Sequence, residues 1–321
     1  LRDLALRIPI SAGAAELILG VIASSMLTFV GVVFTITLVA LQLASAQLSP
    51  RVIRTFVRSG VTKVAFGIFL ATFAYAVVVL VAEGASSSQA VQRGAVTVGV
   101  ALVSASLVVF VVYVTATMRL LQVSWVITAV ADETRRSVGV HYPVASAYVA
   151  ATTPSLDEEP RLVRLQREDA DGGGGELGVV LGVDSGRLVE LAARHGCVLE
   201  VLPRVGEYLP TGAAVVAVHG SAGPRDTQVR RCILLGRSRT LYQDPTFGIR
   251  QLVDVASQAL SPAINQPTTA VYVINRLEDI LLRIARRPPP TGAFVDVAGV
   301  VRLILPAPAW AEIVDLAFTE I

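Results

Sequence analysis

A stretch near the N-terminus, residues 17–50, contains no charged residue over 34 positions. Small and polar residues recur within it at spacings of three and four, which places them on one stripe of a single helix. The members of this polar stripe are Ser24, Thr28, Gly31, Thr35, Leu38, Gln42, Ser45 and Ser49. A helix of that length reaches about 50 Å, which exceeds the roughly 30 Å hydrocarbon core of a membrane. We therefore expect a tilted or projecting membrane helix that ends at Pro50.

Two further runs, residues 64–82 and 94–118, are also long and apolar enough to cross a membrane. Of the 321 residues, 53% are hydrophobic and 16% are charged, whereas soluble domains contain about 25% charged residues. The apolar runs lie in residues 1–130, and residues 131–321 have ordinary charge and turn content. We expect two domains with these bounds. The first is an all-α transmembrane domain of three helices, one of them very long, and the second is a cytosolic α+β domain.

The distribution of Lys and Arg indicates the orientation of the chain in the membrane. The connection after the first run carries four basic residues and no acidic one: Arg51, Arg54, Arg58 and Lys63. By the positive-inside rule this connection is cytoplasmic, so the third helix returns to the cytoplasm and the α+β domain lies there. We therefore expect a multi-pass protein of the bacterial plasma membrane with a cytoplasmic C-terminal domain. A protein that starts in the cytoplasm would need one more helix before Leu1.

The polar stripe has two interpretations. Small residues allow membrane helices to approach closely, and Ser, Thr and Gln hydrogen-bond between helices for about 0.6 kcal/mol each. In a homo-oligomer the same stripe would line a pore instead. The pore-lining residues would be Ser24, Thr28, Thr35, Gln42, Ser45 and Ser49. Gln42 is the costliest of them in hydrocarbon, because its amide needs a partner or water.

Three arginines, Arg51, Arg54 and Arg58, share one helical face directly after the stripe. In a symmetric oligomer they would form cationic rings at the inner mouth of a pore, and such rings favour anions. Arginines at a helix end are equally what the positive-inside rule and anionic lipids require. Both interpretations stay open.

The polar half begins with a pattern of short strands around one helix. Asp184 can cap a helix between the predicted strands 177–183 and 198–202. A turn-rich corner with Gly206 and Gly212 follows, and its turns resemble those of biotinyl-carrier-like modules. This pattern predicts a small β barrel-like module. Because no Met-Lys-Met acceptor is present, we expect no attached cofactor.

The rest of the chain is predominantly helical. An amphipathic helix around residues 251–256 stops at Ser261-Pro262, and a second helix begins near Pro267, where a proline is tolerated in the first turn. Alternating apolar residues predict a single strand at 295–305, and a last helix begins near Pro308.

Two stretches carry a resemblance to a known family. Residues 34–45, followed by Ser49-Pro50-Arg51, resemble the second membrane helix of a bacterial family of predicted membrane proteins of unknown function, DUF2254. Residues 236–265 are similar to the cytosolic signature of the same family. The resemblance covers essentially the whole chain, and it implies a further N-terminal membrane helix but no known activity.

The chain departs from the family pattern at two places. Asn265-Gln266-Pro267 stands where the family commonly has Asn-Asp-Pro. Val112-Tyr113 stands where the family often has a pair of histidines in the last membrane helix.

The signature residues form either a structural corner or a ligand site. Asp244 and Asn265 are residue types that cap helix N-termini, and arginines nearby can pair with aspartates. Arginines beside helix N-termini can alternatively bind an anion or another ligand. The candidate residues are Arg237, Arg239, Asp244, Arg250, Asp254, Ser261 and Asn265. The stretch contains no histidine, nucleophile elbow or carboxylate pair with a base, which disfavours an enzyme.

Other features narrow the function further. A net charge of +2 gives no indication of a nucleic-acid partner. Cys197 and Cys232 have no zinc-binding spacing with the three histidines, so we expect reduced thiols and no metal site. The sequence favours a homo-oligomeric membrane protein that passes ions or small solutes, with membrane lipids and further copies of itself as partners. The alternative is a membrane-anchored sensor or scaffold whose cytosolic domain binds a small ligand, an ion or a partner.

Overall fold

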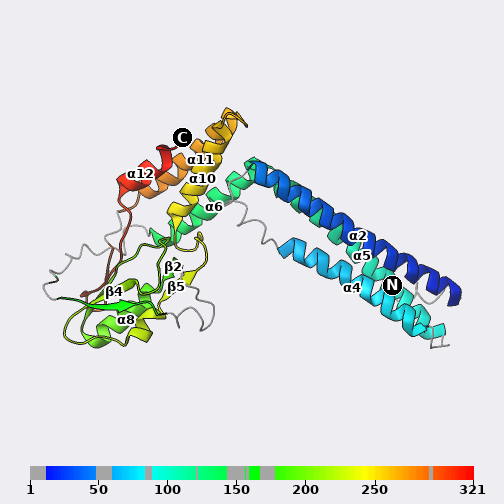
Figure 1. Ribbon diagram of the computed structural model, residues 1–321, viewed down its shortest axis with the longest axis horizontal. Coiled ribbons are helices and arrows are strands. Elements are labelled where there is room, and N and C mark those ends of the chain that lie inside the picture. The colour runs from blue at the N-terminus through cyan, green and yellow to red at the C-terminus, as the bar shows by residue number, and fades with distance from the viewer. Residues whose placement is uncertain are drawn as a thin grey trace. The chain divides into compact units, whose positions relative to one another are not determined.

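The computed structural model of the chain describes residues 12–47, 60–83, 89–120, 122–142, 156, 159–166, 178–288 and 292–321. The chain divides into two compact units, residues 1–126 and residues 127–321. The first unit contains long helices, and the second contains both helices and strands (Figure 1).

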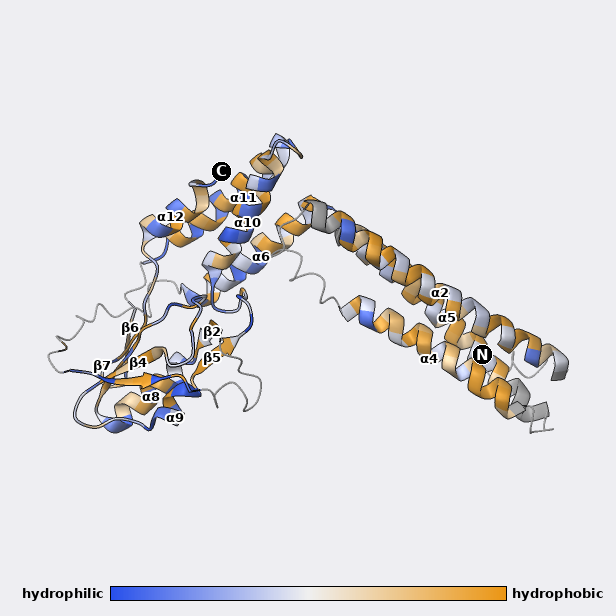
Figure 2. Ribbon diagram, in the orientation of Figure 1, coloured by the Kyte–Doolittle hydropathy of each residue, from blue (hydrophilic) through white to orange (hydrophobic). Residues whose placement is uncertain are grey.

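The first unit is built from three helices: α2 (Ala12–Gln47), α4 (Gly60–Glu83) and α5 (Gln89–Leu120). Each contains a stretch that is long and apolar enough to span a membrane, and these stretches are Gly13–Leu43, Gly60–Ala82 and Gly94–Arg119. Figure 2 shows that the ribbons of these helices are hydrophobic along most of their length. The prediction of three apolar N-terminal helices, the first of them the longest, is confirmed.

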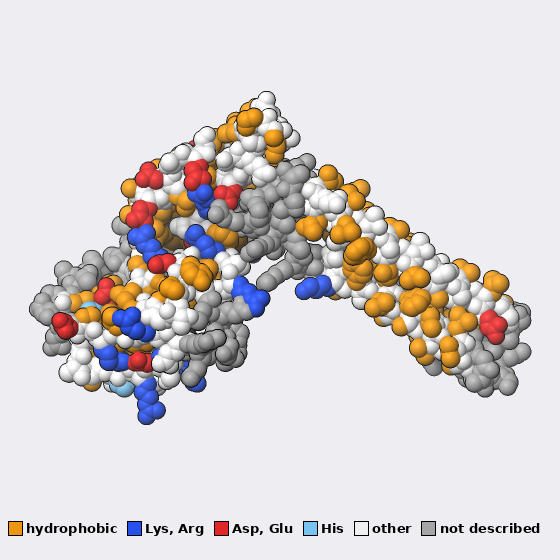
Figure 3. All heavy atoms as spheres, viewed as in Figure 1, with side chains coloured by type: hydrophobic (Ala, Val, Ile, Leu, Met, Phe, Trp, Pro, Cys, Tyr) orange, Lys and Arg blue, Asp and Glu red, His pale blue; other side chains and the backbone are white. Residues whose placement is uncertain are grey.

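The three helices pack around a small apolar core. Met26 of α2, Phe69 of α4 and Tyr113 of α5 are fully buried there. The ring of Phe29 stacks on Phe69 with centroids 5.8 Å apart and meets the edge of Phe110 at 4.9 Å. Many of the other large apolar side chains are exposed, and Figure 3 shows them spread over the face in view. A surface of this kind suits contact with lipid tails, which are as apolar as leucine.

The second unit contains a group of packed helices: most of α6 (Val123–His141), whose first turn belongs to the first unit, and all of α10 (Pro245–Leu260), α11 (Pro267–Ala285) and α12 (Trp310–Phe318). Helices α10 and α11 lie side by side and are joined by the short loop 261–266 (Figure 1). Helix α6 contacts both of them. Thr128 of α6 shares a hydrogen bond of 2.9 Å with Tyr272 of α11, and Thr134 of α6 lies against Gly248 of α10.

The strands form two separate sheets. The larger sheet has five strands in the order β1 (Arg161–Arg164), β4 (Ala214–His219), β3 (Val198–Val201), β7 (Val301–Ile304) and β6 (Ala293–Val295). Strands β3 and β7 are parallel, and the other neighbours are antiparallel. The smaller sheet pairs β2 (Val179–Val183) with β5 (Ile233–Gly236) in antiparallel orientation.

Two short helices accompany these sheets, α8 (Ser185–His195) and α9 (Asp226–Arg230). The carboxylate of Asp184 accepts a hydrogen bond of 3.0 Å from the Arg187 N–H and caps α8, as predicted. Gly196 ends the helix with φ +65°, a left-handed conformation that suits glycine. Leu188 and Leu191 of α8 pack into the same apolar core as the sheet residue Leu199.

The predicted β barrel-like module is not supported, because the described strands form two open sheets. Strand β3 has β7 as its second neighbour, a strand that comes about 100 residues later in the chain. This pairing leaves β1 and β6 as free edges of the larger sheet. Helix α8 packs against β3 and β7 and covers one face, so the sheet buries its apolar side without closing on itself.

The strand predicted at 295–305 is confirmed only over β7, because the structure has a turn before β7 and a separate strand, β6, that ends at Val295. The Asp296 carboxylate accepts hydrogen bonds from the N–H groups of Ala298 and Val300, at 2.9 and 3.0 Å. Gly299 has φ +78°, which a residue with a side chain rarely adopts. These bonds reverse the chain, so β6 and β7 pair as a hairpin.

Candidate functional site

The polar stripe of α2 lies on the outer surface of the three-helix unit. The side chains of Ser24, Thr28, Thr35 and Gln42 are all exposed. The side of α2 that faces α4 and α5 is formed by other residues, among them Met26 and Val33. Packing between α2, α4 and α5 therefore does not use the described stripe residues Ser24, Thr28, Thr35 and Gln42.

The stripe hydroxyls bond to the helix that carries them. Ser24 donates to the carbonyl of Val21 at 3.0 Å, and Thr28 donates to the carbonyl of Ser24 at 3.0 Å. Thr35 donates to the carbonyl of Gly31 at 2.9 Å. Each hydroxyl keeps acceptor capacity, so the stripe still offers oxygen atoms to water or to a neighbouring helix.

The residues predicted at the inner mouth of the pore lie outside the described residues. They are the side chain of Ser45, Ser49 and the three arginines Arg51, Arg54 and Arg58. The placement of these residues stays a prediction.

Other polar residues, outside the polar stripe, lie inside the three-helix unit. The Tyr113 hydroxyl is 2.6 Å from the Thr37 hydroxyl and donates to the carbonyl of Val33 at 3.1 Å. Thr72 and Ser106, both buried, are 3.2 Å apart. Tyr113 occupies one of the two positions at which the chain departs from the family pattern. Its hydroxyl joins α5 to α2.

Asp244 is the centre of the best-defined part of the signature. It is 3% exposed and caps α10 by accepting hydrogen bonds from the Phe247 N–H at 3.1 Å and the Thr246 hydroxyl at 2.5 Å. Arg239 donates to the other carboxylate oxygen through Nε at 2.9 Å and Nη2 at 2.7 Å. The guanidinium of Arg239 also lies 5.1 Å from the centre of the Phe247 ring.

The glycine corner lies directly against this ion pair. A Cβ atom on Gly206 would lie 2.4 Å from Oδ2 of Asp244 and 2.7 Å from Nε of Arg239. Gly206 has φ +90° and donates its N–H to the carbonyl of Val180 at 2.7 Å. The corner therefore joins the small sheet to the start of α10 at a point where only glycine fits.

The remaining signature residues lie elsewhere along α10. Arg250 bonds to Asp254 on the same helix at 3.1 Å and to Glu320 beyond α12 at 2.6 Å. Ser261 caps the far end by donating to the carbonyl of Gln258 at 2.7 Å. Asn265 is exposed and has φ +47°, and it does not cap α11 as predicted, because the N-cap residue of α11 is Gln266.

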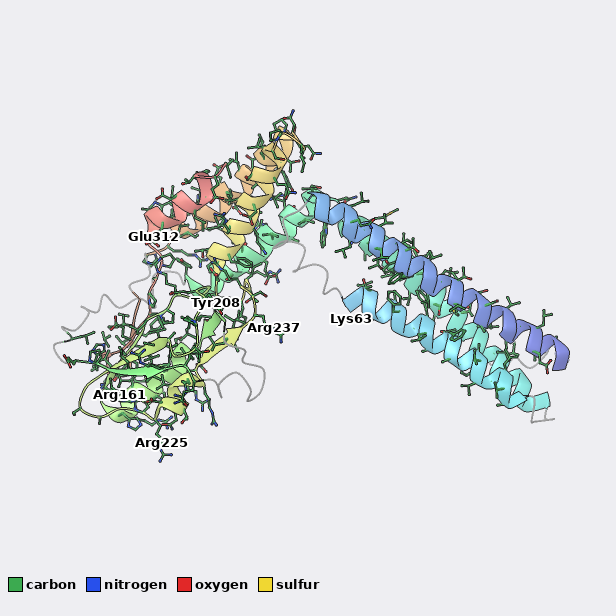
Figure 4. All side chains as sticks on the ribbon, in the orientation of Figure 1. Lys63, Arg161, Tyr208, Arg225, Arg237 and Glu312 are labelled. Carbon is green, nitrogen blue, oxygen red and sulfur yellow. The ribbon has the colours of Figure 1, made fainter. Side chains whose placement is uncertain are left out.

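The signature therefore covers two ends of one helix. A 16-residue helix is about 24 Å long, so Asp244 at its start and Ser261 at its end do not line one pocket. Arg237 is exposed on the segment after β5, where Figure 4 labels it. The structure brings Arg239 together with Asp244, and Arg250 together with Asp254, as ion pairs.

Few groups in the described part of the chain have the chemistry of a catalytic or metal site. No cluster of three His, Cys, Asp or Glu residues suited to a metal ion occurs among the described residues. Cys197 and Cys232 are free and buried, and burial raises the pKa of both thiols, which disfavours the reactive thiolate.

The whole chain, over residues 2–321, matches the family described as "Predicted membrane protein (DUF2254)". The chain belongs to the DUF2254 family. This confirms the resemblance found in the helix and in the signature. It also agrees with the three candidate spans, so this DUF2254 chain is a membrane protein by family and by composition.

Curated relatives of this DUF2254 chain include uncharacterized proteins of Mycobacterium bovis and of Mycobacterium tuberculosis strain H37Rv. Each is 31% identical over 322 residues, an alignment that covers 96% of this chain. The chain spans about 60% of the length of each of these relatives. No solved structure matches the chain.

Proposed function

We propose that this chain is a subunit of a homo-oligomeric channel in the bacterial plasma membrane, which passes ions or small solutes along an axis lined by α2. In this proposal the second unit is cytoplasmic and regulates the channel. The observation that carries it is the exposure of Ser24, Thr28, Thr35 and Gln42 on the outside of the three-helix unit.

The extent of the exposed stripe supports a path across the membrane. From Ser24 to Gln42 an α-helix rises about 27 Å, close to the roughly 30 Å thickness of the hydrocarbon core. The hydroxyls of Ser24, Thr28 and Thr35 reduce their cost in lipid by bonding to the backbone. Gln42 carries two N–H groups and a carbonyl oxygen, which need water or a partner at membrane depth.

The orientation rests on charge. The connection between α2 and α4 contains three arginines, and Lys63 follows near the start of α4, so this connection is assigned to the cytoplasm. The end of α5 and the whole second unit then lie on the cytoplasmic side. Membrane lipids and further copies of the chain are the partners that the proposal requires.

The test is cysteine accessibility combined with flux. Thr35→Cys and Phe34→Cys are made separately, and the purified protein is reconstituted in liposomes. Both side chains are exposed, and consecutive residues of a helix point about 100° apart, so Phe34 is the matched control on a lipid-facing side. The two native thiols are buried, and burial raises their pKa, so they react slowly.

A channel predicts that a charged, water-soluble thiol reagent modifies Thr35→Cys and reduces ion flux, while Phe34→Cys stays unmodified. The proposal fails if reconstituted oligomers carry no flux and both cysteines are equally inert. An added Gln42→Ala variant should change flux if Gln42 faces water, because its amide would then contact the permeating species.

A membrane-anchored sensor or scaffold is the second candidate. It is favoured by the local hydrogen bonds of the stripe hydroxyls, because side chains satisfied in this way can pack dry against a helix of another copy. This candidate predicts that Thr28→Cys forms disulfides between copies in the membrane while the reconstituted protein carries no flux.

A further inference from the structure

The end of the α10–α11 hairpin is unusual for a domain in water because it carries no charge. Residues 255–275, which cover the last turns of α10, the connecting loop and the first turns of α11, contain no Asp, Glu, Lys, Arg or His. Figure 3 shows this end of the molecule, at the top of the view, without blue or red side chains on the visible face. Asp254 and Arg276 are the charged residues that bound the run.

Apolar side chains are exposed on this uncharged end. Leu260 is 41% exposed and Val271 is 55% exposed. Pro262, Ala263 and Pro267 in and beside the loop are exposed as well. Exposed apolar groups that cluster on one uncharged end mark an interaction surface rather than ordinary solvated helix.

Hydrogen bonds fix this end relative to α6. Thr128 of α6 bonds to Tyr272 of α11 at 2.9 Å, and seven residues later in both helices Arg135 bonds to Asp279 at 2.7 Å. The two helices therefore run in the same direction. Pro267 precedes Tyr272 by five residues, so the loop before it lies beyond Thr128 in the direction of the N-terminus of α6.

The first turn of α6 is close to the membrane by covalent connection. Helix α5, which contains the third candidate span, ends at Leu120, and α6 begins at Val123. Three residues of chain reach at most about 10 Å. Trp125, on the first turn of α6, is 38% exposed, and tryptophan favours the membrane–water interface.

We propose that the uncharged end of the α10–α11 hairpin inserts into the interfacial layer of the lipid bilayer, on the side where α5 leaves the membrane. From Asp254 to Leu260 an α-helix rises about 9 Å, which lies within the roughly 5–10 Å depth at which interfacial helices are buried. From Pro267 to Arg276 the rise is about 14 Å, so Arg276 lies beyond that depth, toward the headgroups and water. The Ser261–Asn265 part of the family signature then forms the tip that enters the lipid.

Arg276, at the border of the uncharged end, has a contact that suits the headgroup layer of the bilayer. Arg276 lies over the Tyr272 ring at 4.9 Å and donates to its hydroxyl at 2.6 Å. An arginine and a tyrosine at one level suit the headgroup layer, where the aromatic ring meets apolar chains and the guanidinium meets phosphates. This inference does not rest on the channel proposal, because a scaffold would anchor its second unit in the same way.

The test uses the full chain in lipid nanodiscs. Ala263→Cys, at the loop, is labelled with a small environment-sensitive fluorophore, and Ser221→Cys, an exposed residue of the second unit, is the matched control. Lipids that carry a nitroxide at the upper acyl chain should quench the label at residue 263 by about twofold, and aqueous iodide should quench it weakly. The label at residue 221 should show the opposite pattern.

A double variant, Leu260→Glu with Val271→Glu, should release the tip into water, so iodide should then quench the label at residue 263 as strongly as at residue 221. Both side chains are exposed, so the second unit should stay folded. Quenching of the unmodified tip by iodide would overturn the proposal. Protection from iodide without quenching by the labelled lipid would also overturn it, because a second copy or another protein would then cover the tip.

Discussion

Gly248 of α10 lies so close to Thr134 of α6 that a Cβ atom placed on the glycine would be 1.9 Å from the threonine hydroxyl oxygen. Thr134 is fully buried, and its hydroxyl donates to the carbonyl of Val130 at 2.7 Å. The helix that follows the candidate spans therefore places a side chain directly against the backbone of the signature helix. A contact of this kind transmits a shift of one helix directly to the other, because packed interiors deform little.

Replacement of Gly248 by alanine should destabilise the second unit by about 2 kcal/mol or more, because the added methyl group overlaps Thr134. Gly139→Ala on α6 is the control, since a Cβ there meets nothing within 4 Å. It should leave stability unchanged or raise it by up to about 1 kcal/mol. Thermal unfolding of the detergent-purified protein measures both, and equal effects would contradict the close contact.

The glycine corner, with Gly206 and Gly212, provides a second pair of matched variants. Gly206→Ala should cost about 2 kcal/mol or more, because the new Cβ would overlap Asp244 and Arg239 in addition to the strain of φ +90°. Gly212 has a similar φ of +83° but an open environment, so Gly212→Ala should cost only the backbone strain of about 1 kcal/mol. Chemical denaturation of the two variants separates overlap from strain, and identical midpoints would argue against the overlap.

Arg239→Ala should destabilise the second unit by about 2 kcal/mol, because it leaves the buried Asp244 carboxylate without its cationic partner. The cost stays below that of a fully buried pair, since the Arg239 side chain is 35% exposed. Arg237→Ala, two residues earlier in the same signature and exposed, should change stability by less than about 0.5 kcal/mol. Loss of binding of a small anion in Arg239→Ala, without loss of stability, would contradict the structural role of the ion pair. That result would instead support a ligand site at the signature.

The α6–α11 contact should make stability sensitive to acid. The hydrogen bond from Arg135 lowers the pKa of Asp279 below its ordinary value of 3.8. A lowered pKa in the folded state means that the stabilisation is fully present above about pH 4 and is lost as the pH falls through the folded value. Because both partners are partly exposed, the loss should not exceed about 1 kcal/mol.

Asp279→Asn should remove this part of the acid sensitivity, and Glu278→Gln, at the exposed neighbouring position, should not. Unfolding midpoints measured from pH 6 to pH 3 for the wild type and both variants test the difference. The comparison is needed because Arg302 and Arg204 likewise lower the pKa of Asp296 and Glu312.

Tyr113→Phe should weaken the membrane unit slightly, by about 0.6 kcal/mol, because it removes the hydroxyl that bonds to Thr37 and to the carbonyl of Val33. Thr115→Val, whose hydroxyl bonds only within its own helix at the carbonyl of Val111, is the control and should be neutral. Unfolding in mixed detergent reports the difference. A neutral Tyr113→Phe would mean that the hydroxyl finds an equivalent partner in the unfolded state within the membrane.

Local patterns of the sequence predicted much of the fold. The apolar runs identified the three candidate spans, because the length and apolar composition that a membrane helix requires are properties of one continuous segment. Asp184 predicted the start of α8, and Pro267 lies in the first turn of α11 as expected. Each of these features depends on residues within one or two helical turns.

Features that depend on distant residues were not predictable in this way. The barrel-like module failed because the second neighbour of β3 is β7, and no local pattern records that pairing. The turn at Asp296 was missed because the apolar alternation on both sides of it reads as one strand. In the candidate site, Arg239 and Asp244 are five residues apart and their pairing was foreseen, whereas the approach of Gly206 to them was not.

The parallel pairing of Leu199 in β3 with Leu303 in β7 has a consequence for synthesis of the protein in the cell. The centre of the sheet cannot close until about 100 further residues, including both helices of the hairpin, have left the ribosome. During that interval β3 has an open edge on which another nascent chain can pair. The order of the strands therefore predicts that the second unit folds more slowly than the three apolar helices that precede it in the chain. It also predicts that chaperones protect the open edge of β3 while the chain grows.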